Sequence, residues 1–223
     1  MAVLFDIFLI KRKVFMDNLF KYDNKFFEIL GKITDVVILN LLFIISCLPI
    51  ITIGTSITAS YSVAMRMVKD QETYITREFI KRFKENFKTS TIVWSIMLII
   101  GGVLGFDFYM SKLVLNESIS KVLQLVFTVI SIIYIFTLTY VFPIISKFEN
   151  TIKNTMINST LMSIQNLPYT VIMVILNLSP ILLMSLFSSY WGQIIFFYIV
   201  IGFGVITYIN SIFFEKIFNK FIN

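Results

Sequence analysis

The chain has 223 residues, of which 57% are hydrophobic and only 14% are charged. Soluble domains are about 45–50% apolar and about 25% charged, so a water-soluble fold of this size could not cover its apolar surface. The composition therefore predicts an integral membrane protein. The sequence has no histidine and a single cysteine. This excludes imidazole catalysis, internal disulfides and the usual zinc and iron–sulfur sites, and we expect no cofactor or metal.

The N-terminal segment 1–28 mixes Phe and Leu with Lys and Asp, as an amphipathic segment at the membrane interface does. Its positive charges follow the first apolar stretch, whereas a secretory signal places them before it. We expect residues 29–223 to form one transmembrane helical domain. The net charge of +6 fits basic segments that face anionic lipid, and we expect no nucleic acid partner.

Five apolar runs are long enough to cross a bilayer, for which about 20 helical residues are needed. They are 33–53, 90–110, 121–146, 168–189 and 192–214, and they predict an all-α polytopic transmembrane bundle. The run 55–68 is shorter and rich in hydroxyl and small side chains, so its hydropathy leaves open whether it crosses. Pro49 and Gly54 predict a break between this run and the first span.

The distribution of Lys and Arg favours a sixth membrane segment. If 55–68 crosses or re-enters the membrane, only Lys112 and Lys121 of the 19 basic residues lie outside. With five spans, the two sides carry almost equal numbers. Because Lys and Arg concentrate in cytoplasmic loops, we expect six segments, with both termini cytoplasmic and 55–68 a short helix packed against its neighbours.

The segment 76–88 has the pattern of a basic amphipathic helix on the cytoplasmic side. Its aromatic residues recur at every fourth position, and its basic residues form a neighbouring stripe. The aromatic set is Phe79, Phe83 and Phe87, and the basic set is Arg77, Lys81, Lys84 and Lys88. Two interpretations remain open: a helix that lies on anionic lipid, or a docking surface for a cytoplasmic partner.

The segment 148–166 predicts a second cytoplasmic helix. Asn150, Asn154 and Asn158 repeat at every fourth residue and would share one face of it, close to Glu149. Such an amide stripe is either a solvated helix face or a surface that hydrogen-bonds a partner.

Several of these motifs, in this order, resemble the YesL family of bacterial membrane proteins of unassigned function. The matching positions include Asn40, Pro49, Gly54, Asn86, Phe87, Lys88, Phe148, Glu149, Asn150 and Asn154, and the similarity spans about residues 18–215. Such proteins are typically encoded beside carbohydrate ABC-transport genes. The resemblance therefore implies a bacterial cytoplasmic membrane protein with a role in sugar uptake.

The segment from Glu149 to Leu167 and Pro168 is also similar in spacing to the cytoplasmic coupling loop of ABC importer permeases, although Asn150 and Thr151 replace its alanines. We therefore expect a non-catalytic accessory or regulatory subunit that contacts ABC-transporter subunits. The alternative is a divergent permease-like subunit that pairs with a partner permease and a separate ATPase. The chain has no phosphate-binding loop, so it could not power transport by itself. An enzyme is disfavoured because the carboxylates form no convincing acid–base pair.

Overall fold

The computed structural model describes residues 27–71, 74–114 and 117–222, and every regular element in these ranges is helical. The predicted all-α class is therefore confirmed, whereas the interfacial segment 1–28 lies almost entirely outside the described residues. In chain order the elements are a helix over Phe27–Ser46, η1 (Ile50–Thr52), α2 (Ile53–Val68), α3 (Ile75–Val114), α4 (Glu117–Lys147), α5 (Ile152–Gln165), α6 (Leu167–Leu186), η2 (Ser188–Tyr190), α7 (Trp191–Phe197), η3 (Tyr198–Gly202) and α8 (Phe203–Ile222).

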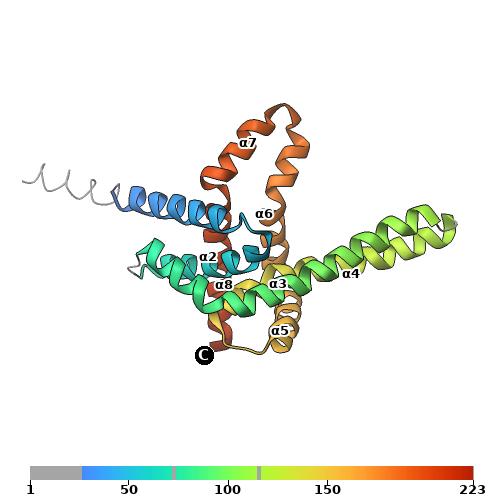
Figure 1. Ribbon diagram of the computed structural model, residues 1–223, viewed down its shortest axis with the longest axis horizontal. Helices are drawn as coiled ribbons and strands as arrows, with labels where there is room; N and C mark the ends of the chain where they lie inside the picture. Colours follow the sequence, from blue (N-terminus) through green and yellow to red (C-terminus); the bar gives the residue numbers. More distant parts are fainter. Residues whose placement is uncertain (1–26, 72–73, 115–116, 223) are drawn as a thin grey trace, which may run out of the picture.

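Within the described residues, five helical stretches are long and apolar enough to cross a membrane: Phe27–Ser46, Ile75–Ser111, Ile119–Lys147, Leu167–Leu186 and Ser188–Phe221. The predicted polytopic membrane protein is thus confirmed. The long helices α3 and α4 form one projecting hairpin, and α6 and α7 form another (Figure 1). At about 1.5 Å per residue, the 40 residues of α3 extend about 60 Å, roughly twice the thickness of a bilayer core. Part of α3 must therefore project beyond the apolar layer.

The short helix α2 lies at the centre of the fold and packs against α3, α4 and α8. Its 16 residues extend about 24 Å, less than a bilayer core, and most of its side chains are buried. Three of its hydroxyl groups, those of Thr55, Ser56 and Thr58, bond within the fold, and Thr58 Oγ1 lies 2.9 Å from Ser90 Oγ. The unusual composition of 55–68 therefore serves close helix packing, because small side chains let helices approach and hydroxyls satisfy one another inside the bundle. The expected short, packed helix is confirmed.

The predicted break before α2 is present, but its two residues act differently. Pro49 has extended backbone angles and immediately precedes η1. Gly54 lies inside α2, where a Cβ atom would come within 2.6 Å of Trp94 Cβ and 2.8 Å of the Ser90 carbonyl oxygen. Gly54 is therefore required by the close approach of α2 to α3, and the chain is broken by the segment 47–52.

Asn40 joins the first helix to the π-helical turn η3. Its side chain is fully buried, and its Nδ2 donates to the carbonyl oxygens of Tyr198 at 3.3 Å and Ile199 at 2.6 Å. Its Oδ1 accepts from the backbone N–H of Gly204 at 2.7 Å. A π-helical turn departs from the regular backbone hydrogen bonding of an α-helix. The buried side-chain amide of Asn40 donates to two backbone carbonyl groups of this turn and accepts from a backbone N–H just after it.

The two predicted cytoplasmic helices have different boundaries in the structure. The segment 76–88 is the first part of α3 and continues without interruption into the apolar run. The segment 148–166 divides into a turn and α5, because α4 ends at Lys147 and α5 begins at Ile152. Thr151 caps α5, and its side chain accepts from the Asn154 backbone N–H. Glu149 and Asn150 therefore lie in the turn, and the three asparagines do not share one helix face.

Candidate functional site

A groove of about 770 Å³ lies between the first part of α3 and the turn that joins α4 to α5. It brings together motif residues that are far apart in the sequence: Asn86 from α3, and Phe148, Glu149 and Asn150 from the turn. The full lining is Arg82, Glu85, Asn86, Thr89, Ile145, Ser146, Lys147, Phe148, Glu149, Asn150, Thr151 and Thr155. The groove therefore presents carboxylates, amides and cations on one surface.

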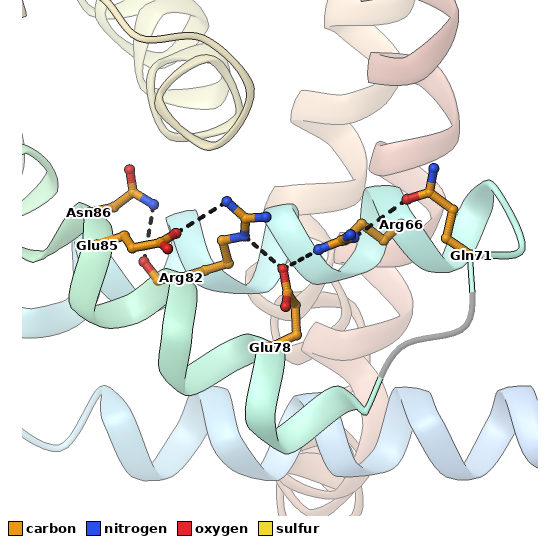
Figure 2. A network of polar contacts seen from close by, with 6 residues as sticks. All are labelled: Arg66, Gln71, Glu78, Arg82, Glu85 and Asn86. Carbon is orange, nitrogen blue, oxygen red and sulfur yellow. Dashed lines mark hydrogen bonds and ion pairs between the residues drawn. The ribbon is translucent and has the colours of Figure 1, made fainter.

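The wall formed by α3 is held by a network of ion pairs (Figure 2). The carboxylate of Glu78 accepts from Arg66 of α2 and, at 2.8 Å, from Nε of Arg82, one turn along α3. Arg82 also donates to Glu85 at 3.1 Å, and its carbonyl oxygen accepts from the Asn86 amide at 3.0 Å. The network fixes the position of the groove wall relative to α2.

A second cluster joins the ends of α2 and α4 to Glu215 within α8, whose side chain is only 6% exposed. Its carboxylate pairs with Lys69, at the end of α2, at 2.8 Å and with Lys147, at the end of α4, at 3.2 Å. The hydrogen bond to Glu215 raises the pKa of the Lys69 ammonium above its ordinary value. The partly buried cluster therefore ties the helices together at the edge of the groove.

The basic stripe of α3 lies on the exposed side of the helix, and Arg77, Lys81, Lys84 and Lys88 are all exposed. A contact of these four with anionic lipid stays a prediction. Two of the neighbouring aromatic residues pack in the core of the protein: Phe79 is 2% exposed, and Phe83 packs against the same core as Phe79. Only Phe87, which is 43% exposed, retains a large surface for a partner.

The other predicted site residues fall into two groups. Asn154 is exposed and Asn158 half-buried on α5, and neither lines the groove. Asn40, Pro49 and Gly54 lie in the helical core or at the break before α2, where their contacts are structural.

Reasoning from the sequence missed the ion-pair clusters. One signal was available, because Glu78 and Arg82 have the i, i+4 spacing of a helical ion pair. Another was Glu215, the single acidic residue after Glu149 in the sequence, which follows directly on a long apolar run. Its partners Lys69 and Lys147 come from other helices, and no sequence pattern connects them.

Among the residues with described positions, no group of three or more His, Cys, Asp or Glu side chains could hold a metal ion. The carboxylates, amides and cations of the groove are suited to bind a polar surface. Neither Glu149 nor Asn150 makes a side-chain hydrogen bond or ion pair with the part of the chain that the structure describes, and both are exposed.

Part of the chain matches a known protein family. Residues 36–108 match the family described as "Protein of unknown function, DUF624". The match covers the second half of the first helix, α2 and most of α3, so it includes Asn40, Gly54 and Asn86 but ends before the turn at Glu149. Neither the curated proteins nor the solved structures contain a match to the chain.

Proposed function

We propose that this protein is a non-catalytic accessory or regulatory membrane subunit that docks a cytoplasmic partner protein in the groove between α3 and the α4–α5 turn. The observation that carries the proposal is the gathering of Asn86, Glu149 and Asn150 around one groove, with the last two exposed. Exposed carboxylates and amides at a groove offer hydrogen bonds that a partner can complete at its polar rim.

The resemblance to YesL proteins suggests what the partner is. YesL-type families carry the DUF624 domain that residues 36–108 match, and the setting implied by the resemblance is carbohydrate uptake. The similarity of Glu149 and the following residues to the coupling loop of ABC importer permeases points in the same direction. We therefore propose a subunit of an ABC-type sugar importer as the partner, and a bacterial cytoplasmic membrane as the location.

The ion pairs support the six-segment orientation within this proposal. Lys32, near the start of the first helix, pairs with Asp70, just after α2, at 2.8 Å. The first helix and α2 therefore run in opposite directions, and α2 brings the chain back to the side where it entered. Because Lys69 and Lys147 both pair with Glu215, the ends of α2 and α4 lie together beside α8. By the positive-inside rule, this side faces the cytoplasm.

A mutational test separates docking from folding. Replacing Glu149 and Asn150 together with Ala removes the exposed groups of the turn and leaves the Thr151 cap in place. The double variant should elute and unfold like the wild type but lose a partner that co-purifies in mild detergent. Buried partner groups would be left without hydrogen bonds, at a cost of about 1–3 kcal/mol each.

The matched control is Lys153→Ala, which changes an exposed residue of α5 outside the groove. It should retain the partner. Unchanged co-purification of every wild-type partner with the Glu149 and Asn150 double variant would contradict docking at this groove.

A permease-like transport subunit is the second candidate, and a cavity of about 370 Å³ in the helical bundle favours it. Its lining is mostly apolar, with Tyr61, Thr139, Asn177 and Thr207 as the polar members. The cavity shares no lining residue with the groove. A transport path for a sugar needs continuous polar groups, so we place this candidate second. Sugar uptake that depends on this chain and stops on Thr139→Trp would favour it.

A further inference from the structure

A smaller cavity of about 280 Å³ adjoins the groove and is lined by the ends of α2 and α4, by α3 and by α8. Its lining is Ser62, Met65, Arg66, Lys69, Gln71, Arg82, Ser146, Lys147 and Glu215. Four of these side chains are cationic and one is a carboxylate. A cavity of about 10–15 Å³ holds a water molecule, so there is ample room for a polyatomic anion.

The cations of this cavity outnumber the carboxylates that hold them. Glu78 is shared by Arg66 and Arg82, and Glu215 is shared by Lys69 and Lys147. Glu85 adds one further contact to Arg82. Even with Glu78 and Glu85 included, which do not line the cavity, four cations face three carboxylates. The wall therefore carries an excess of positive charge in a partly enclosed space, where charges are screened less than at a free surface.

The cationic groups also have hydrogen-bonding capacity beyond their ion pairs. The bonds of Arg66 to Glu78 and Gln71 use its Nη1 and Nε, and Arg82 uses the same two atoms. A guanidinium has five N–H donors and an ammonium has three. Two guanidinium forks and two ammonium groups around one cavity match the oxygen atoms of a phosphate group, which Arg binds in a bidentate manner.

We propose that this cavity is a binding site for a phosphate group, either the headgroup of an anionic phospholipid or a soluble phosphate. Arg66, Arg82, Lys69 and Lys147 bind it. The cavity shares Arg82, Ser146 and Lys147 with the groove, so a bound phosphate would lie beside the docking surface. The proposal does not depend on partner docking, because phosphate binding is measured on the purified chain alone.

The test is thermal unfolding of the full chain in a neutral detergent, with inorganic phosphate titrated against chloride at equal ionic strength. Phosphate should raise the Tm where chloride does not. Arg66→Gln and Lys147→Gln should each bind phosphate about tenfold more weakly or worse, the loss that follows from removing one charge-assisted hydrogen bond. In each variant the carboxylate keeps its second cation, so the fold is preserved. Lys84→Gln removes an exposed cation of α3 that lies outside the cavity, and this variant should bind phosphate as the wild type does.

A comparison in lipid nanodiscs separates the two sources of phosphate. If phosphatidylglycerol discs abolish the phosphate response that phosphatidylcholine discs preserve, the headgroup occupies the cavity; if the response persists, the ligand is soluble. Two results would overturn the proposal. One is a wild-type Tm that responds equally to phosphate and chloride and is the same in both kinds of disc. The other is phosphate binding by Arg66→Gln and Lys147→Gln as tight as that of Lys84→Gln. If one variant fails to fold, the other and the wild-type comparison still decide.

Discussion

Replacing Asn40 with Leu should destabilise the protein far more than an ordinary asparagine substitution in this chain. Leu keeps a similar volume but removes the two donations to Tyr198 and Ile199 and the bond accepted from Gly204. Hydrogen bonds between membrane helices contribute about 0.6 kcal/mol each on average, so three contribute about 2 kcal/mol. A buried N–H left without a partner costs about 1–3 kcal/mol by itself. We expect a loss of about 2–3 kcal/mol.

The measurement is reversible unfolding of the purified chain in mixed detergent micelles, followed by tryptophan fluorescence. Asn154→Ala, on the exposed side of α5, is the control and should change stability by less than about 0.5 kcal/mol. Asn40→Asp keeps an acceptor for the Gly204 N–H but places oxygen against two carbonyls, so it should also destabilise. Wild-type stability in Asn40→Leu would refute the assignment of Asn40 as the group that holds the first helix to η3.

Three further outcomes are expected. Gly54→Ala should lower stability by about 1–3 kcal/mol, because the added Cβ would overlap atoms of α3. Gly102→Ala is the control and should keep the wild-type stability, because its Cβ would meet open space. Equal Tm values for the two variants would contradict the close packing of α2 on α3. Because the pKa of Lys69 is raised in the folded state, its ion pair with Glu215 stabilises the fold below the ordinary lysine pKa of about 10.4, and this stabilisation is lost as the pH rises through the raised pKa. The stability of Glu215→Gln, measured by unfolding at different pH values, should lack this alkaline loss. A pH profile identical to that of the wild type would argue against the pair. In a variant without its native cysteine, a cysteine placed at the exposed position Lys81 should react with a membrane-impermeant thiol reagent only after cell lysis. Labelling of this cysteine in intact cells would overturn the six-segment orientation.

The sequence by itself determined the class of the protein, since its apolar content and its runs of about 20 apolar residues leave no other way to cover the apolar surface. It also located the break around Pro49 and the basic stripe of α3, because backbone restrictions and helical spacing are local properties. The helix boundaries within the segment 148–166 could not be predicted from the sequence. Thr151 caps α5, so the helix begins after Glu149 and Asn150. The recurrence of asparagine at every fourth residue does not by itself show where a helix begins.

Only the tertiary structure decided which of these residues meet. Phe79 has the same spacing signature whether it faces lipid, a partner or the core, and packing against the first helix and α2 buries it. The roles of Asn40 and Gly54 depend on helices that cross them from distant parts of the chain. The groove and the phosphate-sized cavity arise in the same way, because Arg82, Lys147 and Glu215 lie on three different helices. Local pattern specifies the helices, whereas long-range packing of the helices brings their charges together.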